Sequence, residues 1–98
     1  MINQTYKIAH LREQGQDMII IPVTSSVGSK NQHQLNEIKN TLQTFASNAG
    51  LAGTVCLVWS TGNKFNFLAP TQWHNFFRSI DMIFVSNNFN KKLMCYND

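Results

Sequence analysis

The stretch KFNFLAPTQWHNFFRSI, residues 64–80, holds five of the eleven aromatic residues of the chain. Its first six residues alternate between apolar and polar side chains, which is typical of a strand with Phe65 and Phe67 on one face. Pro70 ends this strand, because proline has no backbone N–H to donate to a neighbouring strand. The remainder has helical spacing and predicts a helix over 72–80, whose apolar stripe comprises Trp73, Phe76, Phe77 and Ile80.

We interpret this aromatic density as two halves of one core that meet across a strand–proline–helix corner, in preference to an aromatic binding surface. Burying five aromatic side chains would contribute on the order of 10 kcal/mol before conformational entropy is subtracted, at about 2 kcal/mol each. Exposing them would forfeit most of that contribution in a domain whose net stability is about 5–15 kcal/mol. Any binding surface is therefore expected to use other residues.

Further strands are predicted on the N-terminal side of this stretch. Residues 5–12 alternate loosely, and MIIIPV at 18–23 is a continuous apolar run of the kind found in strands buried on both faces. Turn-forming residues at 14–17 predict a hairpin between them, with the proline at a strand end or on an edge. A second apolar run, TVCLVW at 54–59, is expected to form a hairpin with the strand at 64–69.

The strongest helical signal lies at 30–49. Ser29 and Gln32 fit a capping box, in which each side chain accepts a hydrogen bond from the backbone N–H of the other residue. Apolar residues follow at helical spacing, and Gly50 suits the left-handed conformation that often ends a helix. These apolar residues are Leu35, Ile38, Leu42, Phe45, Ala46 and Ala49.

The C-terminal segment admits two interpretations. Residues 81–86 and 89–96 fit a third hairpin, whereas Val85, Phe89 and Leu93 at four-residue spacing fit a helix. We predict the hairpin, because Val, Ile and consecutive Asn residues disfavour a helix.

The length of the chain, 98 residues, is enough for one core that needs no metal or disulfide. We expect residues 1–98 to form a single small α+β domain of ββ-α-ββ-α-ββ order. Its sheet is expected to be mainly antiparallel and to be covered by the two helices.

The composition predicts a polar surface that is largely uncharged. Charged residues make up only 13% of the chain, whereas there are twelve Asn and seven Gln residues. The formal net charge of +3 is mild, and only Lys91 and Lys92 are adjacent basic residues. Such a surface favours short-range hydrogen bonding over long-range electrostatic attraction.

We expect a cytoplasmic protein with no membrane partner. The first residues lack the basic segment and apolar run of a signal peptide. The longest near-apolar run, residues 51–59, is far shorter than the span of about 20 residues that crosses a membrane. Cys56 and Cys95 both lie in apolar contexts and are expected to be buried free thiols, which suits a reducing compartment.

The sequence predicts no enzyme, no metal site and no cofactor. His10, His33 and His74 have no second ligand at metal-binding spacing except His33 with Glu37, which is more typical of a surface hydrogen-bonding pair. Cys56 has no charged neighbour in the sequence to activate it as a nucleophile. The five carboxylates form no evident acid–base pair, and no phosphate-binding glycine motif is present.

Protein binding is the function that remains, and we expect a non-catalytic protein-interaction module. Exposed strand edges can add a strand from a protein partner or from a second copy in a homodimer. The alternative is a nucleic-acid-binding protein of modest affinity, with strand aromatics for stacking and lysines for phosphates. The residues assigned to these binding surfaces are Trp59, Asn63, Lys64, His74, Arg78, Lys91 and Lys92.

Overall fold

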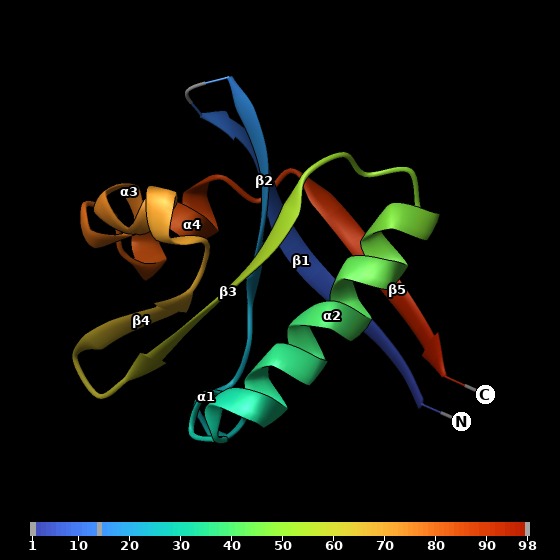
Figure 1. Ribbon diagram of the computed structural model, residues 1–98, viewed down its shortest axis with the longest axis horizontal. Coiled ribbons are helices and arrows are strands. Elements are labelled where there is room, and N and C mark those ends of the chain that lie inside the picture. The colour runs from blue at the N-terminus through green and yellow to red at the C-terminus, as the bar shows by residue number, and fades with distance from the viewer. Residues whose placement is uncertain (1, 14, 98) are drawn as a thin grey trace.

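A computed structural model of the chain describes residues 2–13 and 15–97, with the backbone alone at residues 2, 3, 96 and 97. Five strands form one sheet in the order β4-β3-β2-β1-β5 (Figure 1). They are β1 (Ile2–Glu13), β2 (Gln16–Pro22), β3 (Thr54–Thr61), β4 (Lys64–Leu68) and β5 (Lys91–Asn97). The helices are α1 (Ser25–Gly28), α2 (Gln32–Asn48), the 3₁₀ turn η1 (Thr71–Trp73), α3 (His74–Arg78) and α4 (Met82–Asn87).

The pairing of the strands confirms the α+β class and a mainly antiparallel sheet. Each neighbouring pair is antiparallel except β2 and β3, which are parallel and are connected through α1 and α2. The two hairpins expected from the apolar runs are present as β1–β2 and β3–β4. A parallel pair needs a crossover connection, and the long helix α2 supplies it.

The longest strand, β1, changes its partner along its length. Residues 2–8 pair with β5, and residues 9–13 pair with β2. Pro22 ends β2 beside Val58 of β3, past the last pair that joins β2 to β1. This position confirms the expectation for the proline, which has no N–H for a ladder. The first half of β1 and β5 therefore form a two-stranded extension of the sheet.

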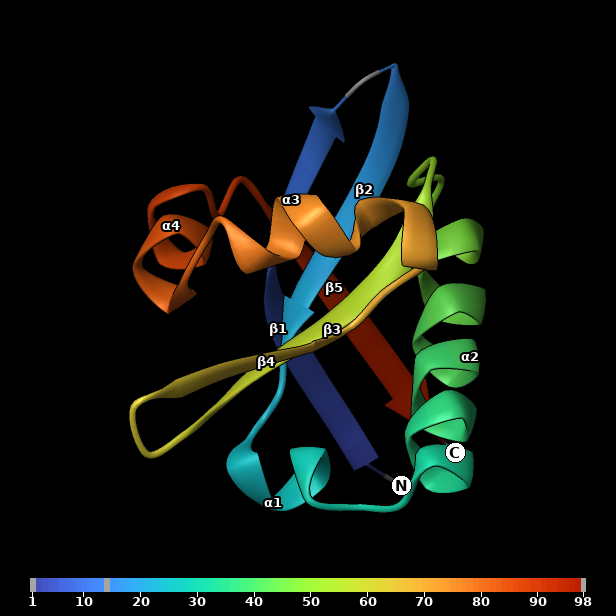
Figure 2. The ribbon, with the colours of Figure 1, turned by 60° about the vertical axis from the view of Figure 1, so that its left-hand side comes forward.

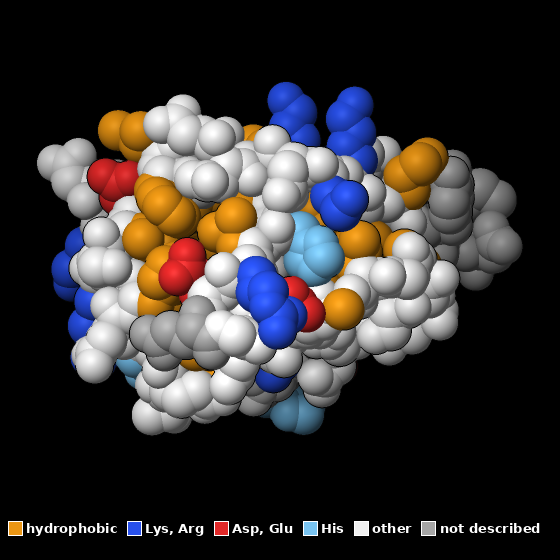
Figure 3. All heavy atoms as spheres, turned by 90° about the horizontal axis from the view of Figure 1, so that it is seen from above, with side chains coloured by type: hydrophobic (Ala, Val, Ile, Leu, Met, Phe, Trp, Pro, Cys, Tyr) orange, Lys and Arg blue, Asp and Glu red, His pale blue; other side chains and the backbone are white. Residues whose placement is uncertain are grey.

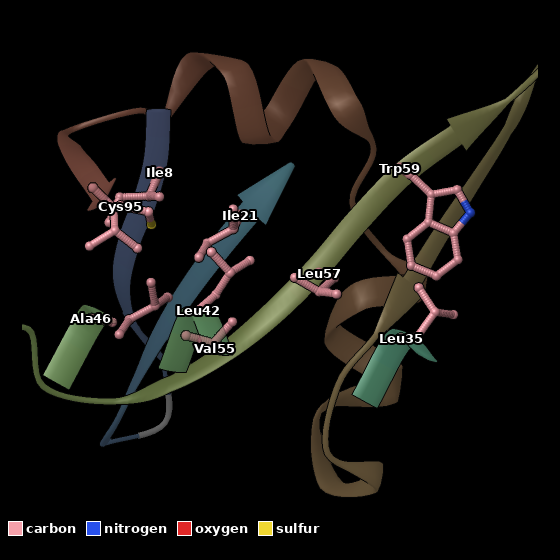
Figure 4. Packing of buried hydrophobic residues seen from close by; sticks show 11 residues of the cluster. Ile8, Ile21, Leu35, Leu42, Ala46, Val55, Leu57, Trp59 and Cys95 are labelled. Carbon is pink, nitrogen blue, oxygen red and sulfur yellow. The ribbon is translucent and has the colours of Figure 1, made fainter. Parts of the chain in front are cut away.

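Helices cover both faces of the sheet, as the two views show (Figures 1 and 2). Alternate residues of β2 point to opposite faces: Ile19 and Ile21 pack beneath α2, whereas Met18 and Ile20 pack beneath α3 and α4. All four side chains are buried, which confirms the interpretation of the continuous apolar run. Figure 4 shows the cluster beneath α2.

The aromatic stretch belongs to the core, as expected. Trp73 and Phe77 are 5% and 0% exposed, and the rings of Phe67 and Phe77 stack with centroids 5.3 Å apart. The helix differs from the prediction of 72–80, because it begins as the 3₁₀ turn η1 and ends at Arg78. Ser79 ends it by donating hydrogen bonds from its backbone and its hydroxyl to the Phe76 carbonyl.

The start of α2 differs from the predicted capping box. The caps are Asn31 and Gln34, each of which accepts from the backbone N–H of the other, at 2.9 Å for Gln34 N and 3.3 Å for Asn31 N. Ser29 is instead the C-cap of α1, and its hydroxyl donates to the Ser26 carbonyl. The cap of α2 lies two residues later than the sequence predicts, because the preceding segment forms the short helix α1, which is capped by Thr24.

The prediction of a third hairpin was wrong, because the segment expected to form its first strand is a helix. Residues 82–87 form α4, and β5 pairs with β1 instead of with this segment. Asp81 caps the helix by accepting from Phe84 N at 2.9 Å, and Asn88 donates its side-chain N–H to the Phe84 carbonyl at the other end. Caps of this kind contribute about 1 kcal/mol, and the fully buried Val85 adds its packing, so together they outweigh the weak helix propensity.

Candidate functional site

The structure distributes the predicted binding residues over separate parts of the molecule. Trp59 belongs to the core, since it is only 9% exposed and packs in the cluster beneath α2. Figure 4 shows its indole ring beside Leu35. The sequence assigns Trp59 to a binding surface, and its burial instead favours a role in the core.

Asn63 and Lys64 are exposed at the β3–β4 turn, on the edge of the sheet opposite to β5. Arg78 is exposed on α3 and donates a hydrogen bond to Asn75 at 3.4 Å. His74 is half-buried and held in place, because its Nε2–H donates to the Ala69 carbonyl at 2.9 Å and its ring meets Phe67 edge-on. Asn63 and Lys64 therefore lie at the opposite edge of the sheet from the lysines of β5.

Lys91 and Lys92 instead meet a lysine that the sequence did not indicate. Lys7 of β1 lies directly opposite Lys92 in the antiparallel ladder, and Lys91 lies opposite Ile8. All three lysines are exposed. We call Lys7, Lys91 and Lys92 the lysine cluster.

Strand alternation fixes the direction of two members of the lysine cluster. Ile8 is buried beneath α2, so its neighbour Lys7 points to the other face of the sheet. Leu93 is buried in the same cluster, so Lys92 and Met94 also point to that other face. Beneath α3 and α4, the core includes no described residue of β5 and only Ala9 and Leu11 of β1. Lys7 and Lys92 therefore project from an uncovered part of the sheet, whereas the same alternation directs Lys91, two residues before Leu93, to the face of Leu93.

No ion pair found among the described residues includes a member of the lysine cluster. Within 2–13 and 15–97, the ion pairs are Arg12 with Asp17 and His33 with Glu37, and neither includes a lysine. Directly opposed residues have Cβ atoms about 4.5–5.5 Å apart, and like charges in that arrangement are destabilising. Figure 3 shows basic side chains projecting together from one border of the molecule, away from the acidic ones.

A hollow of about 620 Å³ lies beside the lysine cluster and is lined by its three members together with Phe89 and Asn90. Asn90 ties the start of β5 to β1, because its Oδ1 accepts from His10 N and its Nδ2–H donates to the His10 carbonyl, both at 2.9 Å. This pair of bonds fixes the backbone on which the adjacent lysines stand. Lys7 also borders a second hollow, of about 500 Å³, where β1 diverges from the end of β2.

The outer edge of β5 is the second feature of this region. β5 is an edge strand of the sheet, so one row of its backbone N–H and C=O groups has no neighbouring strand among the described residues. Met94 is 55% exposed on the uncovered face and is one of two large apolar residues exposed in the described chain, the other being Ile83 of α4. The edge is charged only at its start, by Lys91 and Lys92.

The thiols are placed to remain unreactive. Cys56 and Cys95 are free and buried. Burial raises the pKa of Cys56 to about 12, although Lys39 acts in the opposite direction, and burial also raises the pKa of Cys95. A thiol that keeps its proton at neutral pH is a weak nucleophile.

A groove of about 630 Å³ runs between α2 and the β1–β5 extension, with Tyr6, Glu37, Phe45 and Cys95 among its lining residues. Burial, and secondarily Cys95, raises the pKa of Tyr6. The Glu37 carboxylate is engaged by His33 at 2.8 Å, as the sequence spacing predicted.

Among the residues that the structure describes, no three His, Cys, Asp or Glu side chains come together as a metal site would require. In the same part of the chain, every helix is too short or too polar to cross a membrane.

No protein-family model, curated protein or solved structure matches this chain.

Proposed function

We propose that the protein is a non-catalytic interaction module that pairs with a second copy of itself through the edge of β5. The observation that carries this proposal is the open edge of β5 next to the exposed Met94. A bare strand edge is a template for another strand, and monomeric proteins usually block such edges with charges, prolines or a covering segment. Here the stretch from Leu93 to Cys95 carries no charged residue and no proline.

The position of the charges on β5 favours an antiparallel pair. Lys91 and Lys92 lie at the start of the strand, so in an antiparallel pair centred near Met94 the lysines of the two copies stand at opposite ends. A parallel pair would instead set them side by side, where like charges repel. The antiparallel arrangement also brings the two Met94 side chains together, and it joins two sheets of five strands into one of ten, within the usual range.

Sedimentation velocity over a concentration series tests the proposal. We expect the native chain to dimerise at high micromolar concentration and Met94→Lys to stay monomeric, because two like charges would then face each other across the new strand pair. Ile83→Lys is the matched control, since it charges the other exposed apolar residue, on α4, and should leave dimerisation unchanged. A native chain that remains monomeric, or a dimer that survives Met94→Lys, would contradict the proposal.

We also infer a cytoplasmic setting for this module. The support for it is that both cysteines are buried as free thiols, which suits a reducing compartment.

A further inference from the structure

The lysine cluster has the position expected of a binding site for an anionic ligand. Dimerisation through the edge of β5 does not account for this cluster. Lys7 and Lys92 oppose each other on an uncovered sheet face, and Lys91 lines the same hollow. A pair of opposed lysines weakens the strand pairing that it sits on. Either lysine could be exchanged for a neutral polar residue without loss of any hydrogen bond or ion pair found in the described chain.

We propose that the lysine cluster binds the phosphate backbone of a single-stranded nucleic acid. Phosphates carry negative charge, no ion pair of the described residues engages these lysines, and three lysines can each neutralise one phosphate. The hollow of about 620 Å³ at Phe89–Lys92 and the one of about 500 Å³ beyond Pro22 both border Lys7. The second hollow is also lined by Tyr6, Val27 and Ile38, which pack on the side of the sheet that faces α2.

The surroundings of the lysines favour a single strand over a duplex. Next to Lys92, the uncovered face presents Met94 at 55% exposure, with Thr5 opposite to it in the ladder. Phe89 is half-buried and lines the hollow with the lysines. Unpaired bases can lie on an open sheet and against such apolar side chains, whereas a duplex hides its bases and is usually read by a helix or ribbon in a groove.

This site differs in its members from the nucleic-acid surface that the sequence indicated. Lys64 is on β4, at the far edge of the sheet, and Arg78 is on α3. Lys7 takes their place through the pairing of β1 with β5. Because all three lysines belong to one copy of the chain, the proposal does not require the dimer.

Fluorescence polarisation of the full chain with a labelled oligonucleotide tests the site. The probe is a mixed-sequence DNA single strand of about 12 nucleotides, within the usual site size. With three phosphates neutralised, log Kobs should fall against log[salt] with a slope of about −2, a loss of roughly 15-fold between about 50 and 200 mM salt.

Substitutions within the cluster give the specific prediction. Lys7→Gln, Lys91→Gln and Lys92→Gln should each weaken binding and reduce the slope by about 0.7, and the triple variant should abolish binding. Lys64→Gln is the matched control, because it removes another exposed lysine, at the opposite edge of the sheet, and should leave affinity unchanged. Circular dichroism of Lys7→Gln and Lys92→Gln should show a fold as stable as the native one or more stable, since a repulsion is removed.

The proposal is overturned by absent binding at low salt, by binding that the triple variant retains, or by an equal effect of Lys64→Gln. Tighter binding to a duplex of the same sequence would overturn its choice of a single strand. A failure of dimerisation leaves this result unaffected, so the two proposals can fail separately.

Discussion

Gly28→Ala is expected to destabilise the fold strongly, because Gly28 is the residue that allows Trp59 to be buried. Gly28 is the last residue of α1, and a Cβ atom added there would overlap the Cγ, Cδ1 and Nε1 atoms of the Trp59 indole. The overlap is with a ring that is itself packed against the sheet and α2, so it cannot rotate away as the tip of a flexible side chain could.

The structure bounds the magnitude of this effect. If the indole were expelled, an aromatic side chain would lose about 150–250 Å² of burial, which at about 25 cal/mol per Å² is roughly 4–6 kcal/mol. If α1 moved instead, the effect would be that of an overpacked core, about 1–3 kcal/mol. α1 has four residues and none of them is buried, so it is the easier part to move. We therefore expect a loss of about 2–3 kcal/mol.

Urea unfolding followed by circular dichroism measures this loss in two backgrounds. In Trp59→Ala the Cγ, Cδ1 and Nε1 atoms that overlap are all absent, so Gly28→Ala should there change stability by less than about 0.5 kcal/mol. Gly50→Ala is the control: its Cβ would meet no atom within 4 Å, but its φ of +80° is unfavourable for alanine. It should therefore cost about 1–2 kcal/mol in both backgrounds alike. An equal cost of Gly28→Ala in the two backgrounds would refute the assignment of Trp59 to a packed core.

Two further predictions concern the buried thiol and the cap of α2. Because burial raises the pKa of Cys56 from 9.0 to about 12, its contribution to stability is complete below pH 9 and is lost as pH rises toward 12. At about pH 10 the free energy of unfolding of the native chain, measured by urea titration, should have fallen by roughly 1.4 kcal/mol more than that of Cys56→Val. If the stability of both proteins changed with pH in the same way, Cys56 would not be a buried thiol. Asn31→Ala should lower stability by about 1 kcal/mol in thermal unfolding, whereas Ser29→Ala should change it by less than about 0.5 kcal/mol. A larger effect of Ser29→Ala would instead support the capping box of Ser29 and Gln32 that the sequence suggests.

The regular elements could be predicted because their signals are local. The apolar run at 18–23 and the helical stripe on α2 reflect burial of both faces and of one face, and the structure shows that burial. The alternation at 64–69 correctly predicts a strand, although the residues of β4 are only partly buried. Segment 81–86 was misread because its propensities favour a strand while its caps favour a helix. The signal that could have corrected it is Asp81, three residues before Phe84, a spacing typical of an N-cap.

The candidate site could not be predicted in the same way, because it depends on strand order. Lys7 and Lys92 come from the two ends of the chain. They meet only because the first half of β1 pairs with β5, whereas its second half pairs with β2. Lys64 was grouped with Lys91 and Lys92 on residue type alone, and the sheet separates β4 from β5 by three strands. Residue types identify candidates, whereas the pairing of distant strands decides which of them act together.

The two proposals for β5 support each other in geometry although they are tested separately. An antiparallel pair of edge strands has its two-fold axis perpendicular to the sheet, so both uncovered faces lie on the same side of the joined sheet. With the pair centred at Met94, the two Lys92 residues would stand four residues apart along the strands, about 13 Å at the strand rise of about 3.3 Å per residue. Both lysine clusters could then contact one extended strand of nucleic acid. The open edge and the opposed lysines, each unfavourable in an isolated monomer, would together form one continuous binding face.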